Sequence, residues 1–155
     1  MPHASVSRRV AAPLPVVWQV FTDVPTATRR IAGVSDVEML SSYVSGLGTR
    51  WRETRTVYGR TSTEEFEVVD YEREHRYVVT SRGRGARYRT QYTFDALGTD
   101  ATTVLAVFTV RGNTMVAGMV GVVVWPVTRR TVRKVLAQDV DDLAAAAERE
   151  VGEPL

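Results

Sequence analysis

A carboxylate and a guanidinium that should share one face of a strand are the side chains in this chain best suited to chemistry. Over residues 48–58, an extended backbone places Trp51, Glu53, Arg55 and Val57 on one side. In a dry pocket such a pair could perform acid–base catalysis, or it could orient one polar group of a bound molecule. Glu53 and Arg55 are therefore the candidate catalytic residues. The alternative is that the pair is simply exposed to solvent.

Aromatic side chains recur on the corresponding face of the strands that follow. Tyr77, Tyr88 and Tyr92 each bring a hydroxyl that needs a partner if it is buried. Rings with a few convergent polar groups are typical of ligand pockets, whereas a packed core would send these hydroxyls to the rim of the sheet. With two methionines from the apolar segment described below, the candidate ligand-binding set is Trp51, Glu53, Arg55, Phe66, Tyr77, Tyr88, Tyr92, Phe108, Met115 and Met119.

The residue types exclude several other chemistries. A chain without cysteine has no disulfide, no thiolate nucleophile and no zinc–thiolate site. Its two histidines, His3 and His75, are far apart in sequence, so we expect no metal site. The chain also lacks a phosphate-binding loop, a dinucleotide fingerprint and a nucleophile elbow, and we expect no cofactor. A net charge of +2, with acidic and basic residues interleaved, argues against a nucleic-acid partner.

Alternating hydrophobic patterns separated by turn residues predict seven strands. We expect them at residues 3–10, 34–42, 48–58, 61–71, 75–83, 86–96 and 101–111. The connections after residue 34 are too short for crossover helices, so these strands should pair as antiparallel hairpins in a curved sheet. Two short helices, one from about residue 12 and one over 26–32, should follow the first strand.

The end of the chain, residues 115–149, is predicted to form one long helix with two different halves. Residues 115–125 carry no charge, whereas beyond Pro126 apolar residues recur at three- and four-residue steps. The uncharged half is the predicted cover for the concave face of the sheet. The expected architecture is α+β, with the sheet gripping this helix.

The 155 residues fit a single domain, residues 1–155. The first residues have no apolar signal-peptide core, so a cytoplasmic location is expected. The uncharged run of 11 residues is shorter than the roughly 20 that cross a membrane, and we expect no stable membrane insertion. The sequence does not distinguish a monomer from a homodimer.

Three stretches carry a resemblance to a known family. They are AAPLPVVWQVFTD at 11–23, GTRWRETRTVYG at 48–59, and DLAAAAE at 142–148. With the order of predicted elements, they are similar to the helix-grip fold of the START and pollen-allergen superfamily (SRPBCC), in particular its bacterial polyketide cyclase/dehydrase and lipid-transport-like branch. The resemblance implies a cavity between sheet and helix that holds a lipid, hormone or polyketide. It carries over no catalytic residue, because the cyclases share no single motif.

Three functions follow from these observations. The favoured interpretation is binding, transport or sequestration of a small hydrophobic or aromatic ligand, such as a lipid or polyketide, without catalysis. The second is a cyclase or dehydratase that uses the same cavity without a metal or nucleotide cofactor. The third is a module that binds a protein or a membrane through the apolar residues 116–125.

Overall fold

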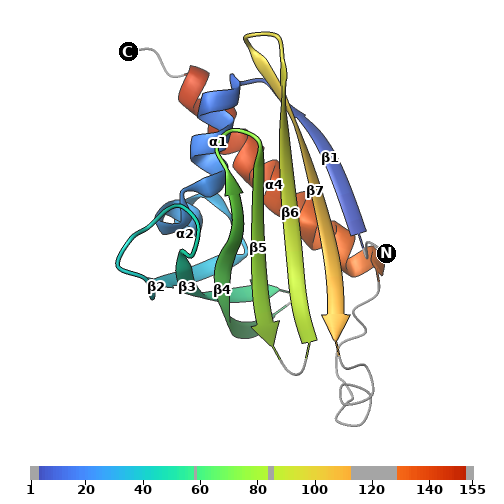
Figure 1. Cartoon of the computed structure of the whole chain (residues 1–155). Helices are drawn as coiled ribbons and strands as arrows, with labels where there is room; N and C mark the ends of the chain where they lie inside the picture. The colour runs from blue at the N-terminus through green and yellow to red at the C-terminus, as the bar shows by residue number, and fades with distance from the viewer. Residues whose placement is uncertain (1–3, 58, 84–85, 113–128, 153–155) are drawn as a thin grey trace.

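The computed structural model describes residues 4–57, 59–83, 86–112 and 129–152 (Figure 1). Its strands are β1 (Ala4–Val10), β2 (Val34–Met39), β3 (Arg50–Val57), β4 (Arg60–Glu72), β5 (Arg76–Gly83), β6 (Ala86–Leu97) and β7 (Ala101–Gly112). Its helices are α1 (Leu14–Thr22), a 3₁₀ turn η1 (Val24–Thr26), α2 (Ala27–Arg30) and α4 (Arg129–Gly152). The predicted seven strands and the two short helices after the first strand are confirmed, as is the part of the long terminal helix beyond residue 128.

The strands form one antiparallel sheet in the order β1-β7-β6-β5-β4-β3-β2. Short turns join β3 through β7 in sequence, while β1 pairs with β7 at the other end of the order. Long antiparallel sheets twist and curl because each strand has a right-handed twist. In Figure 1 the strands β5 to β7 stand upright in front of α4, whereas β2 and β3 turn across the lower left. The sheet therefore wraps around the helix.

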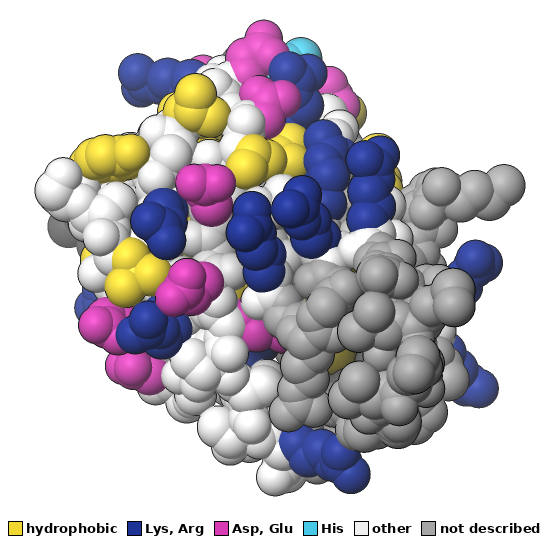
Figure 2. Space-filling view, turned by 60° about the horizontal axis from the view of Figure 1, so that its bottom comes forward, with side chains coloured by type: hydrophobic (Ala, Val, Ile, Leu, Met, Phe, Trp, Pro, Cys, Tyr) yellow, Lys and Arg dark blue, Asp and Glu magenta, His cyan; other side chains and the backbone are white. Residues whose placement is uncertain are grey.

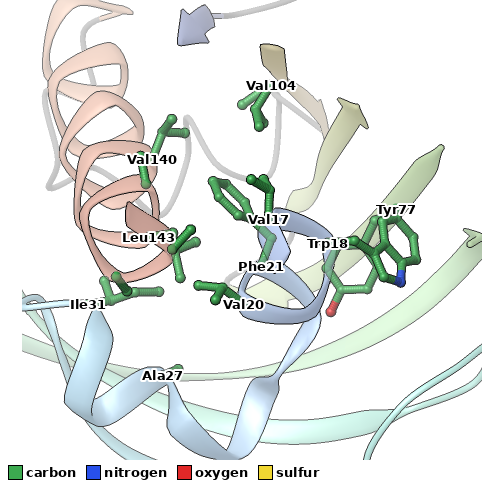
Figure 3. Packing of buried hydrophobic residues seen from close by; sticks show 14 of the residues in the cluster. Val17, Trp18, Val20, Phe21, Ala27, Ile31, Tyr77, Val104, Val140 and Leu143 are labelled. Carbon is green, nitrogen blue, oxygen red and sulfur yellow. The ribbon is translucent and has the colours of Figure 1, made fainter. Parts of the chain in front are cut away.

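The charged half of the predicted terminal helix packs against the rest of the fold. Leu136, Val140 and Leu143 lie one turn apart on α4 and are buried. Figure 3 shows Val140 and Leu143 pointing toward residues of α1. The predicted uncharged half, with Met115 and Met119 and the possible interaction surface 116–125, lies outside the described residues.

Helix α1 also covers the concave face, which corrects the prediction that the terminal helix does so alone. Trp18 lies edge-on to Phe94 and to Tyr77, with ring centroids 5.1 Å and 6.2 Å apart. Phe21 makes similar contacts with Phe94 and Tyr92, at 5.6 Å and 6.0 Å. Aromatic pairs prefer this edge-to-face geometry. Part of the expected hollow is thus occupied by packed rings from α1.

Acidic residues along α4 bind groups from the start of the chain. Asp141 pairs with Arg8 at 3.4 Å, Glu148 accepts a hydrogen bond from the backbone N–H of Ala11, and Asp142 accepts one from Ala32. Exposed ion pairs add little stability by themselves. Spread along the helix, however, these contacts are compatible with only one rotation of α4 about its axis.

We predict that Leu143→Ala lowers the free energy of unfolding by about 2–4 kcal/mol, because it leaves a cavity where α4 meets the core. Urea denaturation measures this loss. The matched control is Leu105→Ala on the outer face of β7, where Leu105 is 39% exposed; it should change stability by less than about 0.5 kcal/mol. Equal losses in the two variants would contradict the packing described here.

Candidate functional site

Strand β3 presents its predicted face to the interior. Trp51 and Glu53 are only 4% and 7% exposed, and Arg55 is partly buried. The alternative prediction, that the Glu53–Arg55 pair is exposed to solvent, is therefore wrong. Alternation along the strand accounts for the result, since Arg50 and Arg52 occupy the outer face.

The predicted aromatic residues come together as three pairs across neighbouring strands. Trp51 stacks on Phe66 with centroids 5.5 Å apart, and these residues are direct partners in the β3–β4 register. Tyr77 lies opposite Tyr92 at 6.1 Å across β5 and β6. Tyr88 of β6 stacks on Phe108 of β7 at 5.8 Å. The structure therefore gathers the predicted rings on one curved surface, with Phe66, Tyr88, Tyr92 and Phe108 only partly buried.

The guanidinium of Arg55 is held between two carboxylates. Its Nε donates to Glu53 Oε2 at 2.7 Å. Its Nη1 donates to Asp139 Oδ1 at 3.1 Å, and its Nη2 lies 2.8 Å from Asp139 Oδ2. The second oxygen of Glu53 accepts a hydrogen bond from the indole N–H of Trp51 at 3.3 Å. We call Glu53, Arg55 and Asp139 the buried charge cluster; it joins β3 to α4.

Sequence reasoning missed Asp139, although a signal was present. Asp139 lies three residues after Leu136 and one before Val140, so it belongs to the apolar stripe of α4. A lone carboxylate within a buried stripe needs a cation or several hydrogen-bond donors. Nothing in the sequence alone identifies that cation as Arg55, which lies 84 residues away.

The environment raises the pKa values of Arg55 and Asp139. Burial alone would lower the pKa of Arg55, but the nearby carboxylates of Asp139 and Glu53 outweigh that effect and raise it, so the guanidinium is always charged. Burial raises the pKa of Asp139 above its usual 3.8, and Arg55 offsets part of this increase. With both carboxylates ionised, the cluster carries a net charge of −1.

Tyr77 and Tyr92 are poised to donate hydrogen bonds beside this cluster. Burial raises the pKa of each hydroxyl; neighbouring Tyr92 raises that of Tyr77 further, and Asp139 does the same for Tyr92. Both therefore stay protonated at neutral pH. Within the described part of the chain neither hydroxyl forms a hydrogen bond to another side chain or to the backbone.

The arrangement restricts the chemistry of Arg55. Its guanidinium is already occupied by Glu53 and Asp139, so it is poorly placed to receive an anionic group. Glu64 lies opposite Glu53 in the register, is half-buried and has interaction partners of its own. What the cluster offers a bound molecule is carboxylate acceptors and tyrosine donors. Among the described residues, no group of three His, Asp or Glu side chains could hold a metal ion.

A separate cleft of about 510 Å³ opens along one side of α1. It is lined by residues of α1, the β2–β3 connection and the β4–β5 turn, including Trp18, Tyr71 and Glu74. None of the predicted site residues lines it. Its polar wall, with Gln19, Asp23 and Arg73, suits water better than an apolar ligand.

The family profile for polyketide cyclase / dehydrase and lipid transport matches residues 1–148. The chain belongs to this family. No curated protein matches the sequence. Within the described residues, no helix is both long and apolar enough to cross a membrane.

Solved structures share the helix-grip fold at low sequence identity. The two-domain aromatase/cyclase of the steffimycin biosynthetic pathway is 16% identical, with a TM-score of 0.75. The match covers 96% of this chain and 46% of the aromatase/cyclase, so this chain spans about half the length of that protein. The Zhui aromatase/cyclase of a Streptomyces species is 23% identical, with a TM-score of 0.67 and 95% and 93% of the two chains covered. Norcoclaurine synthase of Thalictrum flavum, solved with dopamine and hydroxybenzaldehyde, is 15% identical, with a TM-score of 0.67 and coverage of 92% and 83%.

We predict that Arg55→Met destabilises the fold by about 3 kcal/mol at pH 7, because it leaves two carboxylates in the interior without a cation. The 22% exposure of the Arg55 side chain places the loss at the lower end of the range for such changes. Without the cation, the pKa of Asp139, which burial already raises, rises further in the folded state because the offsetting charge of Arg55 is gone. The lost stability should therefore return as the pH falls from 7 toward 5.

Urea denaturation of the variant at both pH values measures this effect. Arg52→Met is the control, because Arg52 pairs with Glu38 and Glu65 on the exposed outer face. It should change stability little and without a matching dependence on pH. A loss in Arg55→Met that is independent of pH would show that packing, not charge, is responsible.

Proposed function

We propose that this protein binds a small, largely aromatic ligand between the concave face of the sheet and α4, and that the ligand is neutral or cationic. The observation that carries the proposal is the buried charge cluster, in which a guanidinium paired with two carboxylates lies beside two tyrosine hydroxyls in an otherwise aromatic surface. Such a combination of rings and a few oriented polar groups is the usual composition of a ligand site.

Residual exposure of the cluster supports access by a ligand. The side chains of Arg55 and Asp139 are 22% and 13% exposed, although packed elements surround both. The partly buried rings of Phe66, Tyr88 and Phe108 would supply contact area on the same face. Met115 and Met119 remain proposed contacts from the part of the chain that is not described.

The relatives support the ligand class. Two of the structures are named as aromatase/cyclases, and the norcoclaurine synthase structure contains dopamine and hydroxybenzaldehyde, which are small aromatic molecules. The family description includes polyketides and lipids. An aromatic ligand also suits a wall built from three pairs of rings.

Charge distinguishes the ligands that this site should accept. A carboxylate or sulfonate placed beside the cluster would meet two carboxylates, and the one cation is already paired. At short range in a medium of low polarity, each such repulsion is worth several kcal/mol before screening. An amine or a phenol would instead donate to the carboxylates and accept from Tyr77 or Tyr92.

A matched pair of fluorescent dyes tests both parts of the proposal. N-phenyl-1-naphthylamine is neutral, and 8-anilino-1-naphthalenesulfonate has the same ring system with one added sulfonate. We expect the neutral dye to bind at least about tenfold more tightly in a fluorescence titration. If neither dye binds, the ligand-binding function itself is contradicted; equal affinities would contradict only the charge preference.

Removing one carboxylate should reverse this preference in part. In Asp139→Asn the guanidinium of Arg55 loses one of its two anions and becomes available to the sulfonate. We predict a gain in affinity for the anionic dye of about tenfold or more, with the neutral dye changed less than threefold. The control Asp141→Asn removes a carboxylate from the exposed side of the same helix and should leave the affinities for both dyes unchanged.

A second candidate function is a cyclase or dehydratase acting in the same site. It is favoured by one observation, a buried carboxylate with a raised pKa close to a tyrosine hydroxyl, since such groups perform acid–base catalysis in dry pockets. Tyr92→Phe would then lower kcat for aromatic cyclisation by about 10² or more while leaving dye affinity within twofold. Parallel losses of rate and affinity would favour binding alone.

A further inference from the structure

Three arginines stand directly opposite one another on the outer face of the sheet. Arg82 of β5 is the register partner of Arg87 on β6, and Arg87 is the partner of Arg111 on β7. All three side chains are exposed. Alternation fixes their side, because Ser81 and Tyr88, their neighbours in sequence, belong to the opposite face of the sheet.

Arg89 extends this group along β6. It lies two residues beyond Arg87, on the same face, and is the register partner of Thr109. We call Arg82, Arg87, Arg89 and Arg111 the outer arginine group. Figure 2 looks toward this end of the molecule and shows basic side chains gathered in a band across the surface.

No acid in the described part of the chain neutralises the outer arginine group. None of the four forms an ion pair with a described residue. The acid opposite Arg82 is Glu65, whose carboxylate lies 3.1 Å from Arg52 and 3.7 Å from Arg50. The only described acid directly opposite a member of the group is therefore already engaged, and Glu67, two residues along β4, forms no ion pair with the group.

This concentration of charge has an energetic cost that folding does not require. Adjacent strands lie about 4.8 Å apart, and like charges directly opposite each other destabilise a sheet. The whole chain carries a net charge of only +2, so four arginines on three neighbouring strands that pair with no described acid are a local concentration of charge. An external partner that brings negative charge would remove the repulsion.

We propose that the outer arginine group docks this protein on the surface of an anionic lipid bilayer. The four residues form an array on the outside of three strands, not a pocket, which suits an extended surface of headgroups better than a single small anion. Guanidinium groups bind phosphate oxygens through paired hydrogen bonds. Docking is a property separate from the proposed ligand binding.

The sequence beyond β7 favours a lipid surface over an acidic protein. Residues 115–125 contain no charged side chain, and they follow Arg111 after three residues. Basic residues together with a nearby apolar segment are the two signals that hold peripheral proteins on membranes. Each arginine close to an anionic bilayer strengthens binding by about fivefold, an effect that salt screens.

Vesicle flotation tests the proposal. We expect the full chain to float with vesicles containing 30% phosphatidylglycerol, and not with pure phosphatidylcholine vesicles or in high salt. The variant Arg82→Gln/Arg87→Gln/Arg111→Gln should bind the anionic vesicles about 100-fold more weakly. Its unfolding temperature should be equal to that of the natural chain or slightly higher, because the repulsion has been removed.

A control variant separates position from net charge. Arg9→Gln/Arg29→Gln/Arg149→Gln removes three exposed arginines elsewhere and has the same total charge. It should keep most of the vesicle binding. The proposal is overturned if the natural chain does not float with anionic vesicles, or if both triple variants lose binding equally. It is also overturned if the protein binds nucleic acid or an acidic protein through these arginines but does not bind the vesicles. Dye affinity in all variants should stay unchanged, so a failure here is distinguishable from a failure of ligand binding.

Discussion

The interior of this protein depends on one guanidinium that satisfies two buried carboxylates. Arg55 links Glu53 on its own strand to Asp139 on α4, so this cation connects β3 to the helix that the sheet surrounds. A carboxylate left alone in this environment would be costly, and the geometry therefore restricts both the face that β3 presents and the rotation of α4. The ion pairs of α4 with Arg8 and Arg30 form in the same orientation of the helix.

This constraint also determines what the proposed site would offer to a ligand. In many pockets an arginine recognises an anion, but here both carboxylates reach Arg55 first. In the proposed site, the groups that would face a ligand are carboxylate oxygens and the hydroxyls of Tyr77 and Tyr92, within a wall of paired rings. Helix α1 fills the neighbouring part of the concave face with Trp18 and Phe21, so a ligand site is restricted to the side near β3 and α4.

Charged side chains are paired on the inner face of the sheet, whereas the arginines of the outer arginine group form no ion pair with a described residue. Inside, every described charge of the cluster has a partner at hydrogen-bond distance, as a low-polarity environment demands. Outside, four arginines form no ion pair with a described residue, and a sheet surface exposed to water can retain them at modest cost. The interior pattern is explained by folding, whereas the outer pattern is the basis of the proposed membrane docking.

The sequence by itself determined the strands, the face that each strand presents and the order of elements, because these follow from alternation, turn residues and local spacing. It placed Trp51, Glu53 and Arg55 on one side of β3 for that reason. It could not pair Arg55 with Asp139, bring Tyr92 beside them, or show that α1 shares the concave face. Those contacts join residues far apart in the chain, and only the curvature of the sheet and the crossing of the helices decide which distant side chains meet.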